Sequence, residues 1–440
     1  MQNSIKPTWL VFPIICFALQ GNSLLAQEDP TKASGPSVNP LFKQFTAEES
    51  HGFMQNFVLN DALGTGRASI WFGTNAAQVL PTAVVPNRQA ARELKSEVMP
   101  QIGTVTATTS LGEMSLEQFI YHPQSVAQGF IVVHKGRIVF EQYPGMREAD
   151  AHVLASAAKV TASLLVDVLI EEGKIDEHKT MADYVPALAG SVWAPIKVID
   201  VIDMSTGLDT IDGPEHFANP DSVIARMLRA EIGEPYKGKV ETMLGVMKEA
   251  KPVSEPGEYF TYSSTATQAL ALLAEAASGQ TWAEAFDQRI WSKMGVEGPF
   301  QVHLTPEGIA MAHGLLSMRL RDLARFGMLY TPSWKKIAAE QIVTPEILER
   351  TRVPYRSREF YRAGPSGKKF MERLGDDSVL TGGRQWDAVW DDGDFFKAGF
   401  NTQGIYVSPA RDLVIAYFSV EPTQQIQKYL RPLVTSGLFE

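Results

Sequence analysis

The stretch Leu154–Leu165, LASAAKVTASLL, places Ser156 three residues before Lys159 at the start of an apolar run. Apolar residues recur at helical spacing as far as Leu169, and Gly173 follows two glutamates as an expected C-terminal stop. The stretch therefore predicts a buried helix that packs on a sheet. Residues three apart lie on one face of a helix, so we expect the serine and lysine side chains to meet.

This spacing is typical of an activated nucleophile. A serine hydroxyl needs a base, and a lysine amine becomes one when burial or nearby cations lower its pKa. The same spacing occurs at Ser333/Lys336 and Ser366/Lys369, in polar sequence flanked by proline or glycine. Only Ser156 opens a long apolar helix, whose N-terminal N–H groups are suited to stabilise an oxyanion. We take Ser156 as the candidate nucleophile; a helix N-cap serine is the alternative.

Two further motifs follow in order along the chain. Tyr262-Ser263-Ser264 precedes an apolar helical run, and Lys397-Ala398-Gly399 leads into β-branched sequence. Similar patterns occur elsewhere, at Tyr355/Ser357, Tyr406/Ser408 and Lys293/Gly295. Structural alternatives also exist, because Tyr262 suits a packed core, Ser264 a helix N-cap and Lys397 a strand edge.

With these motifs the sequence resembles the serine β-lactamase and penicillin-binding-protein superfamily, in its class C-like branch with esterase and 6-aminohexanoate-dimer hydrolase relatives. The resemblance runs from about Gln128 to Glu421 and includes EEGKID, DYVPALAG, VIDMSTGL, EPGEYFTYSSTATQALALL and LRDLARFGMLY. It implies a β-lactamase-like α+β fold, in which helices flank an antiparallel sheet and a mostly helical subdomain is inserted.

The resemblance also implies roles for individual residues. Ser156 would be the acylated nucleophile, Lys159 its partner and Tyr262 a proton relay. Ser264, Lys397, Gly399 and Phe400 would bind substrate, and the N–H groups of Ser156 and Phe400 would form the oxyanion hole. Either Lys159 or Tyr262 can be the general base, and the sequence leaves that choice open.

Two departures from the family pattern bear on the substrate. Ala398 stands where many β-lactam-recognising members carry Thr or Ser, and Ser264 stands where β-lactamases of this branch usually have Asn. We therefore expect a serine hydrolase for a small ester or amide. The alternatives are a catalytically inactive, penicillin-binding-like protein, or a true β-lactamase or D-amino-acid peptidase.

Two motifs of other hydrolase classes are missing from the sequence. It contains neither the Gly-x-Ser-x-Gly elbow of an α/β-hydrolase nor the His-x-x-x-His pair of a metalloenzyme.

The remaining sequence outlines the domain organisation. Residues 128–143, QGFIVVHKGRIVFEQY, predict a hairpin turning at His134–Arg137, and strand-like sequence returns only near the C-terminus, in FFKAGF, GIYVSP and DLVIAYFSV. A sheet built from both ends of the chain follows. We expect a leader and an irregular N-terminal lobe over 27–120, and a hydrolase domain over 121–440 with a helical insertion at about 176–300.

Residues 1–26 have the pattern of a secretory signal. Lys6 is their only charge, Trp9–Leu19 is an apolar run and Ala26 ends a plausible cleavage site. We expect a secreted or periplasmic protein without a stable membrane span after removal of the signal, which also removes Cys16, the only cysteine. The formal net charge of −10 would become −11, which argues against a nucleic-acid partner. The sequence indicates no cofactor and no metal site.

Overall fold

The computed structural model describes residues 45–353, 355–374 and 379–440. The expected signal over 1–26, with Cys16, and the leader up to residue 44 lie outside the described residues. In the part of the chain that is described, none of the helices combines the length and apolar character needed to cross a membrane.

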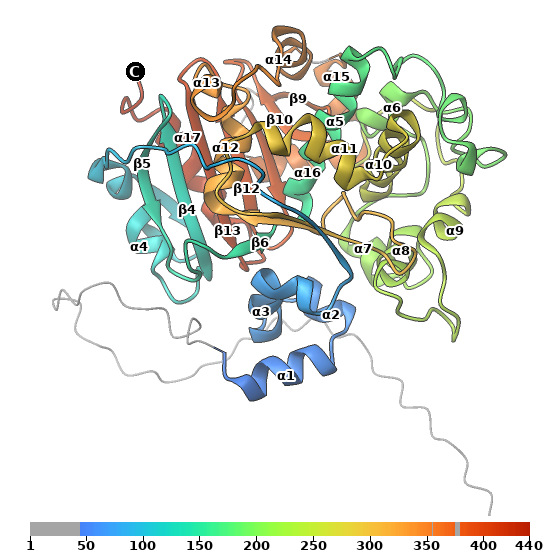
Figure 1. Ribbon diagram of the computed structural model, residues 1–440, viewed down its shortest axis with the longest axis horizontal. Helices are drawn as coiled ribbons and strands as arrows, with labels where there is room; N and C mark the ends of the chain where they lie inside the picture. Colours follow the sequence, from blue (N-terminus) through green and yellow to red (C-terminus); the bar gives the residue numbers. More distant parts are fainter. Residues whose placement is uncertain (1–44, 354, 375–378) are drawn as a thin grey trace, which may run out of the picture. The chain divides into compact units, whose positions relative to one another are not determined.

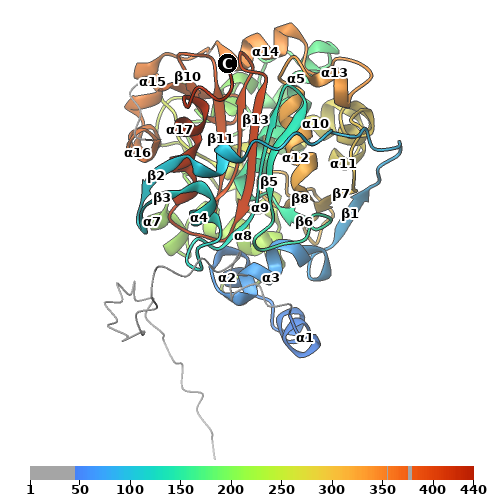
Figure 2. The ribbon, with the colours of Figure 1, turned by 90° about the vertical axis from the view of Figure 1, so that its left-hand side faces the viewer.

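A seven-stranded antiparallel sheet forms the centre of the fold (Figure 2). Its strands, in spatial order, are β5 (Arg137–Gln142), β4 (Ala127–His134), β13 (Leu413–Ser419), β12 (Gln403–Ser408), β11 (Phe395–Gly399), β10 (Trp386–Trp390) and β9 (Val379–Gly383). The two ends of the chain meet where Phe130 of β4 pairs with Tyr417 of β13. The expected α+β fold is confirmed, with a sheet assembled from both ends of the chain.

The predicted hairpin at 128–143 is present as β4 and β5. His134 pairs with Arg137, and the two residues between them, Lys135 and Gly136, have φ angles of 48° and 67°. Positive φ at both central residues is the geometry of a two-residue turn that matches strand twist. The tight turn fixes the register of the strands that carry the apolar core.

A second sheet was not predicted from the sequence. Its strands, in spatial order, are β1 (Thr82–Val85), β7 (Phe300–His303), β8 (Leu316–Arg319) and β6 (Ala151–Val153). The expectation that strands return only near the C-terminus was therefore wrong. Strands of three or four residues are too short to show a period of two, so their pairing depends on long-range contacts. The structure also has a small hairpin, β2 (Thr106–Thr109) with β3 (Gly112–Ser115).

The helices of the middle segment gather on one side of the large sheet (Figure 1). They are α6 (Val198–Ile202), α7 (Pro214–Ala218), α8 (Val223–Glu231), α9 (Met243–Lys248), α10 (Ser264–Ser278) and α11 (Trp282–Arg289). The later helices are α12 (Leu320–Met328), α13 (Trp334–Ile337), α14 (Pro345–Arg352), α15 (Arg358–Ala363), α16 (Pro365–Leu374) and α17 (Leu430–Val434). Among them α12 packs on the sheet, where Gly327 leaves room for Val414 and Ile405.

The helix expected after Ser156 begins one turn later than the sequence suggested. Residues Ala155–Ala158 form a 3₁₀ turn, and the α-helix α5 runs over Lys159–Glu171 with ten buried residues. Ala155 has φ of +45°, a conformation that is uncommon for a residue with a Cβ and is found at functional sites. This turn carries Ser156 and leads directly into the α-helix at Lys159. Gly173, with φ of +69°, ends the helix as expected.

Helices also occur in the segment expected to be irregular. They are α1 (Ala47–Gln55), α2 (Leu59–Leu63), α3 (Arg67–Asn75) and α4 (Leu116–Ile120). The first is closed by a capping box in which Thr46 and Glu49 exchange hydrogen bonds. Trp71 and Phe72 of α3 form a separate small apolar core with Val153 and Met311. This segment therefore packs on residues close in sequence to the site.

Candidate active site

The Ser156 and Lys159 side chains meet as the helical spacing predicted. Lys159 Nζ lies 3.1 Å from Ser156 Oγ, and the lysine is completely buried although the serine is only half-buried. The amine also donates to Ser264 Oγ at 2.8 Å and to the carbonyl oxygen of His313 at 2.8 Å. Three polar contacts around one amine fix its position beside the serine hydroxyl.

The environment of Lys159 favours its neutral form. Burial lowers the pKa of Lys159 to about 7, and the Lys397 cation acts in the same direction. The carboxylates of Asp212, Asp387 and Glu231 oppose this shift without cancelling it. An amine with a pKa close to neutrality can accept a proton at physiological pH, which an ordinary lysine does not.

Tyr262 lies between the two lysines. Lys397 Nζ donates to the Tyr262 hydroxyl at 2.9 Å, and Lys159 Nζ lies 5.4 Å from the centre of its ring. Burial, together with the carboxylates of Asp387 and Asp212, raises the pKa of Tyr262 well above its ordinary value, although its hydrogen bond with Ser156 acts to lower it. The structure thus brings together Ser156, Lys159, Tyr262 and Lys397, and it keeps the tyrosine protonated.

Asp387 is a site residue that sequence reasoning missed. It lies on β10, one step along the ladder from the pair Ala388 and Phe396, and so directly opposite Lys397. One carboxylate oxygen accepts from Lys397 Nζ, and the other accepts from the N–H of Ala398 at 3.0 Å and from Arg373 at 3.3 Å. A signal did exist, because an aspartate inside the apolar strand WDAVW needs a buried partner.

Ser264 takes part in the site and does not cap a helix. The N-cap of α10 is Ser263, whose hydroxyl accepts from the N–H of Ala266 at 3.1 Å, so the capping alternative for Ser264 is wrong. The Ser264 hydroxyl instead lies between Lys159 and Asp212, and it donates to Asp212 Oδ2 at 2.5 Å. Asp212 was also missed, because Asp212-Gly213 has the pattern of an ordinary turn.

Gly399 allows β11 to approach the turn that carries Ser156. A Cβ on Gly399 would lie 2.7 Å from the carbonyl oxygen of Leu154 and 3.2 Å from the Cβ of Ala155. Within the described residues, no hydrogen bond uses the N–H of Ser156 or the N–H of Phe400, the residue after Gly399. Two uncommitted donors are therefore available for the oxyanion hole that the resemblance implied.

Substitution of Gly399 tests this close approach. Gly399→Ala is expected to lower stability by about 1–3 kcal/mol, because the new methyl meets a backbone oxygen that cannot turn away. We also expect kcat for an ester to fall by roughly 10²-fold, because the N–H of Phe400 shifts with β11. Thermal unfolding and steady-state kinetics measure the two effects. Gly52→Ala is the control, since a Cβ there meets nothing within 4 Å; equal effects of the two changes would contradict the assignment.

Two helices border the site with contacts that the sequence did not indicate. The exposed ring of Phe400 packs edge-on against Phe217 of α7, with centroids 6.5 Å apart. Lys369 of α16 pairs with Glu215 of α7 at 3.0 Å. On the inner side of α16, the ring of Phe370 lies 5.0 Å from that of Tyr262. The border of the site is therefore partly aromatic.

The two other Ser-x-x-Lys pairs do not form a nucleophile and a base. Ser333 donates to Asp412 at 2.5 Å, whereas Lys336 donates to the carbonyl oxygen of Lys135. The hydroxyl of Ser366 accepts from the N–H of Tyr262 at 2.9 Å, and Lys369 is engaged by Glu215. Of the three pairs, all of them within the described residues, only Ser156 and Lys159 have side chains at hydrogen-bond distance from each other.

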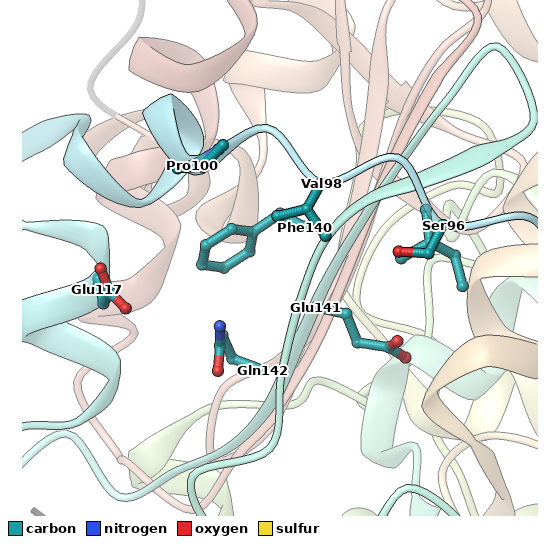
Figure 3. Close-up of a pocket in the computed structure, with 8 residues that line it drawn as sticks. Ser96, Val98, Pro100, Glu117, Phe140, Glu141 and Gln142 are labelled. Carbon is teal, nitrogen blue, oxygen red and sulfur yellow. The ribbon is translucent and has the colours of Figure 1, made fainter. Parts of the chain in front are cut away.

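A surface cavity elsewhere contains none of these residues. It has a volume of about 250 Å³ and is bordered by β5, α4 and the segment around Val98, with Phe140, Glu117 and Glu141 in its wall (Figure 3). Most of its carboxylate and amide groups are engaged, as in the pair of Glu141 with Arg321. Over residues 45–353, 355–374 and 379–440, no group of three or more His, Cys, Asp or Glu side chains is arranged to hold a metal ion.

Comparison with known proteins agrees with this fold. Residues 122–434 match the family described as Beta-lactamase, and the chain belongs to that family. It is 26% identical over 359 residues to the 6-aminohexanoate-dimer hydrolase of Paenarthrobacter ureafaciens. This alignment covers 80% of the present chain and 85% of the relative.

Solved structures of related proteins share this fold. A candidate 6-aminohexanoate-dimer hydrolase from Bacillus anthracis superposes with a TM-score of 0.70 at 23% identity, covering 87% of this chain and 96% of that one. A class C β-lactamase variant superposes with a TM-score of 0.51 at 15% identity, covering 73% and 95%. At these identities the likeness concerns the fold alone.

Proposed function

We propose that this chain is a serine hydrolase that cleaves a small ester or linear amide through an acyl-enzyme on Ser156. The observation that carries the proposal is the buried Lys159 amine, 3.1 Å from Ser156 Oγ, with a pKa lowered to about 7. Membership of the Beta-lactamase family and the similarity to a 6-aminohexanoate-dimer hydrolase support it.

The two candidate proton carriers differ in what their surroundings favour. Neutral Lys159 can accept the Ser156 proton, whereas Tyr262, with its raised pKa, retains its own proton. Because Lys397 donates to the Tyr262 oxygen, the tyrosine hydrogen is left to donate. We therefore assign Lys159 as the general base and Tyr262 as the group that donates to the departing alcohol or amine.

The reaction then proceeds in two halves. Ser156 Oγ attacks the acyl carbon and its proton passes to Lys159, while the negative carbonyl oxygen is held by the N–H groups of Ser156 and Phe400. The leaving group takes a proton from Tyr262, which is reprotonated from Lys159. Water then attacks the acyl carbon, gives a proton to Lys159 and releases the acid, and Ser156 regains its proton.

The site has few free polar groups to bind the carboxylate and amide of a β-lactam, and this favours a small ester or linear amide as substrate. Ala398 has no hydroxyl to offer a carboxylate, and the Ser264 hydroxyl is held by Lys159 and Asp212. A buried polar group left without a partner costs roughly 1–3 kcal/mol. The aromatic border at Phe217 and Phe400 suits a hydrocarbon acyl chain.

A direct comparison of substrates tests this specificity. We expect kcat/KM for p-nitrophenyl acetate or butyrate to exceed that for a chromogenic cephalosporin by at least ~10²-fold, because two hydrogen bonds to a β-lactam are missing. Ala398→Thr should narrow the ratio by restoring one hydroxyl, and Ser408→Thr on β12 serves as the control. A cephalosporin that is the better substrate would contradict the specificity and favour a true β-lactamase.

We also propose that the protein is exported, on the sequence of residues 1–26 alone. Lys6, the apolar run Trp9–Leu19 and the small residue Ala26 have the order of a secretory signal. Mass spectrometry of the mature protein, recovered from periplasm or medium, should give Gln27 as the first residue. A chain that retains Lys6 in the cytoplasm would contradict export.

A further inference from the structure

Asp212 lies beside Ser264, whose hydroxyl is one of the three polar contacts of the Lys159 amine. Its carboxylate accepts from the N–H of Ser264 at 3.0 Å and from the Ser264 hydroxyl at 2.5 Å. Its own N–H donates to the carbonyl oxygen of Tyr262 at 2.9 Å, which holds Asp212 against the segment that carries the site. The aspartate therefore has fixed contacts with the residues on either side of Ser263.

The hydrogen of the Ser264 hydroxyl is committed by this arrangement. A carboxylate only accepts hydrogen bonds, so the single hydroxyl hydrogen of Ser264 points to Asp212. The Ser264 oxygen can then only accept from Lys159 Nζ, 2.8 Å away. The carbonyl oxygen of His313, also 2.8 Å from Nζ, is likewise an acceptor only.

The consequence concerns the lone pair of neutral Lys159. A neutral amine has two hydrogens and one lone pair, and both hydrogens are taken by Ser264 and His313. The third contact of the amine, at 3.1 Å, is the Ser156 hydroxyl. We infer that Asp212 is a positioning residue which, through Ser264, directs the Lys159 lone pair at Ser156. This inference rests on the proposed function, for which it names the group that orients the base.

An asparagine at position 212 would remove this direction. Its amide can donate to the Ser264 oxygen, which frees the serine hydrogen to point at Lys159 and to occupy the lone pair. The charge effect is separate and has a definite sign. Asp212 raises the pKa of Lys159 against the effect of burial, so its neutralisation lowers that pKa below about 7.

Other charged groups around Lys159 stay in place in such a variant. They are Lys397 on β11, Asp387 on β10 and Glu231 on α8, and the titratable neighbours Tyr262 and His313 also keep their places. A change that merely opened the site to water would reduce the effect of burial and raise the pKa of Lys159 towards its ordinary value. The direction of the pH shift therefore separates positioning from structural damage.

The test is the rate at which a fluorophosphonate probe labels Ser156, measured against pH. In that reaction Ser156 Oγ bonds to phosphorus, fluoride leaves and the serine proton passes to Lys159, so no natural substrate is needed. For the parent protein we expect the rate to rise with pH to a plateau, with a midpoint near 7. For Asp212→Asn we expect a plateau lower by roughly 10–10²-fold and a midpoint at lower pH.

Two further variants complete the experiment. Asp322→Asn is the matched control, because Asp322 is buried and accepts from two backbone N–H groups, of Glu297 and Gly298, outside the site; its midpoint should be unchanged. Ser264→Ala should lower the plateau of the labelling rate as Asp212→Asn does. If Asp212→Asn does not fold, the plateau of Ser264→Ala serves as the test of the inference. Three outcomes would overturn the inference but leave the proposed function standing. The first is an unchanged plateau in Asp212→Asn, and the second is a midpoint in that variant that stays or rises. The third is a shift of the midpoint in Asp322→Asn equal to that in Asp212→Asn. Absence of Ser156 labelling in the parent protein overturns the proposed function as well.

Discussion

Ser156→Ala is expected to lower kcat for a p-nitrophenyl ester by about 10⁵- to 10⁶-fold, because loss of the nucleophile removes the acyl-enzyme route entirely. Intact-mass spectrometry after incubation with a slowly hydrolysed ester should show an acyl adduct on the parent protein and none on the variant. The fold should survive, since the Ser156 hydroxyl is half-buried and its loss leaves no large cavity.

Ser333→Ala is the matched control for this experiment. Ser333 has the same spacing to a lysine, but its hydroxyl donates to Asp412 and its lysine contacts a backbone oxygen. The control should retain both the adduct and the activity. An adduct found by peptide mapping on Ser333 or Ser366, or an active Ser156→Ala protein, would show that the nucleophile lies elsewhere.

Lys159→Ala and Tyr262→Phe are each expected to lower kcat by about 10²- to 10⁴-fold, the range for loss of a general acid or base. In the proposed mechanism both carriers belong to one relay, because Lys159, 3.1 Å from Ser156 Oγ, takes the serine proton and then reprotonates Tyr262. Their effects should therefore be strongly non-additive, and the double variant should be little worse than the poorer single variant.

The measurement is a double-mutant cycle on kcat with one ester substrate. Thr161→Ser, on α5 but with its hydroxyl bonded to the carbonyl oxygen of Ala158, is a suitable control for changes within the helix. Losses that multiply in the double variant would mean that the two residues act independently. A Lys159→Ala protein with parental activity would exclude the lysine as base.

The sequence predicted the parts of the site that local periodicity determines. Ser156 and Lys159 are three residues apart at a helix start, so their contact follows from helix geometry. The hairpin at 128–143 follows similarly from its turn residues and alternating apolar side chains. Lys397 was distinguished from Lys293 by its β-branched surroundings, and the structure places it on β11.

The partners supplied by distant segments could not be obtained in this way. Asp387 meets Lys397 only because β10 and β11 pair in one register, and Asp212 meets Ser264 across 52 residues. Each aspartate also has a common local interpretation, as strand interior or turn. Ser263 and Ser264 could not be ranked as N-caps from sequence, because a shift of one residue at a helix start reverses their roles.

The N-terminal helices and β1 have a consequence for any shortened form of this protein. A fragment limited to the family-matched residues 122–434 would lack β1, and β7 would then present bare backbone groups at the margin of its sheet. It would also expose Met311, which packs against the N-terminal helices. In addition, Ile138 of β5 would lose its backbone pairing with Ser96 and Glu97. Exposed edge strands promote association between chains, because their unpaired backbone groups can bond to another strand. The segment needed for a stable, monodisperse protein is therefore longer than the family-matched segment that contains the candidate active site.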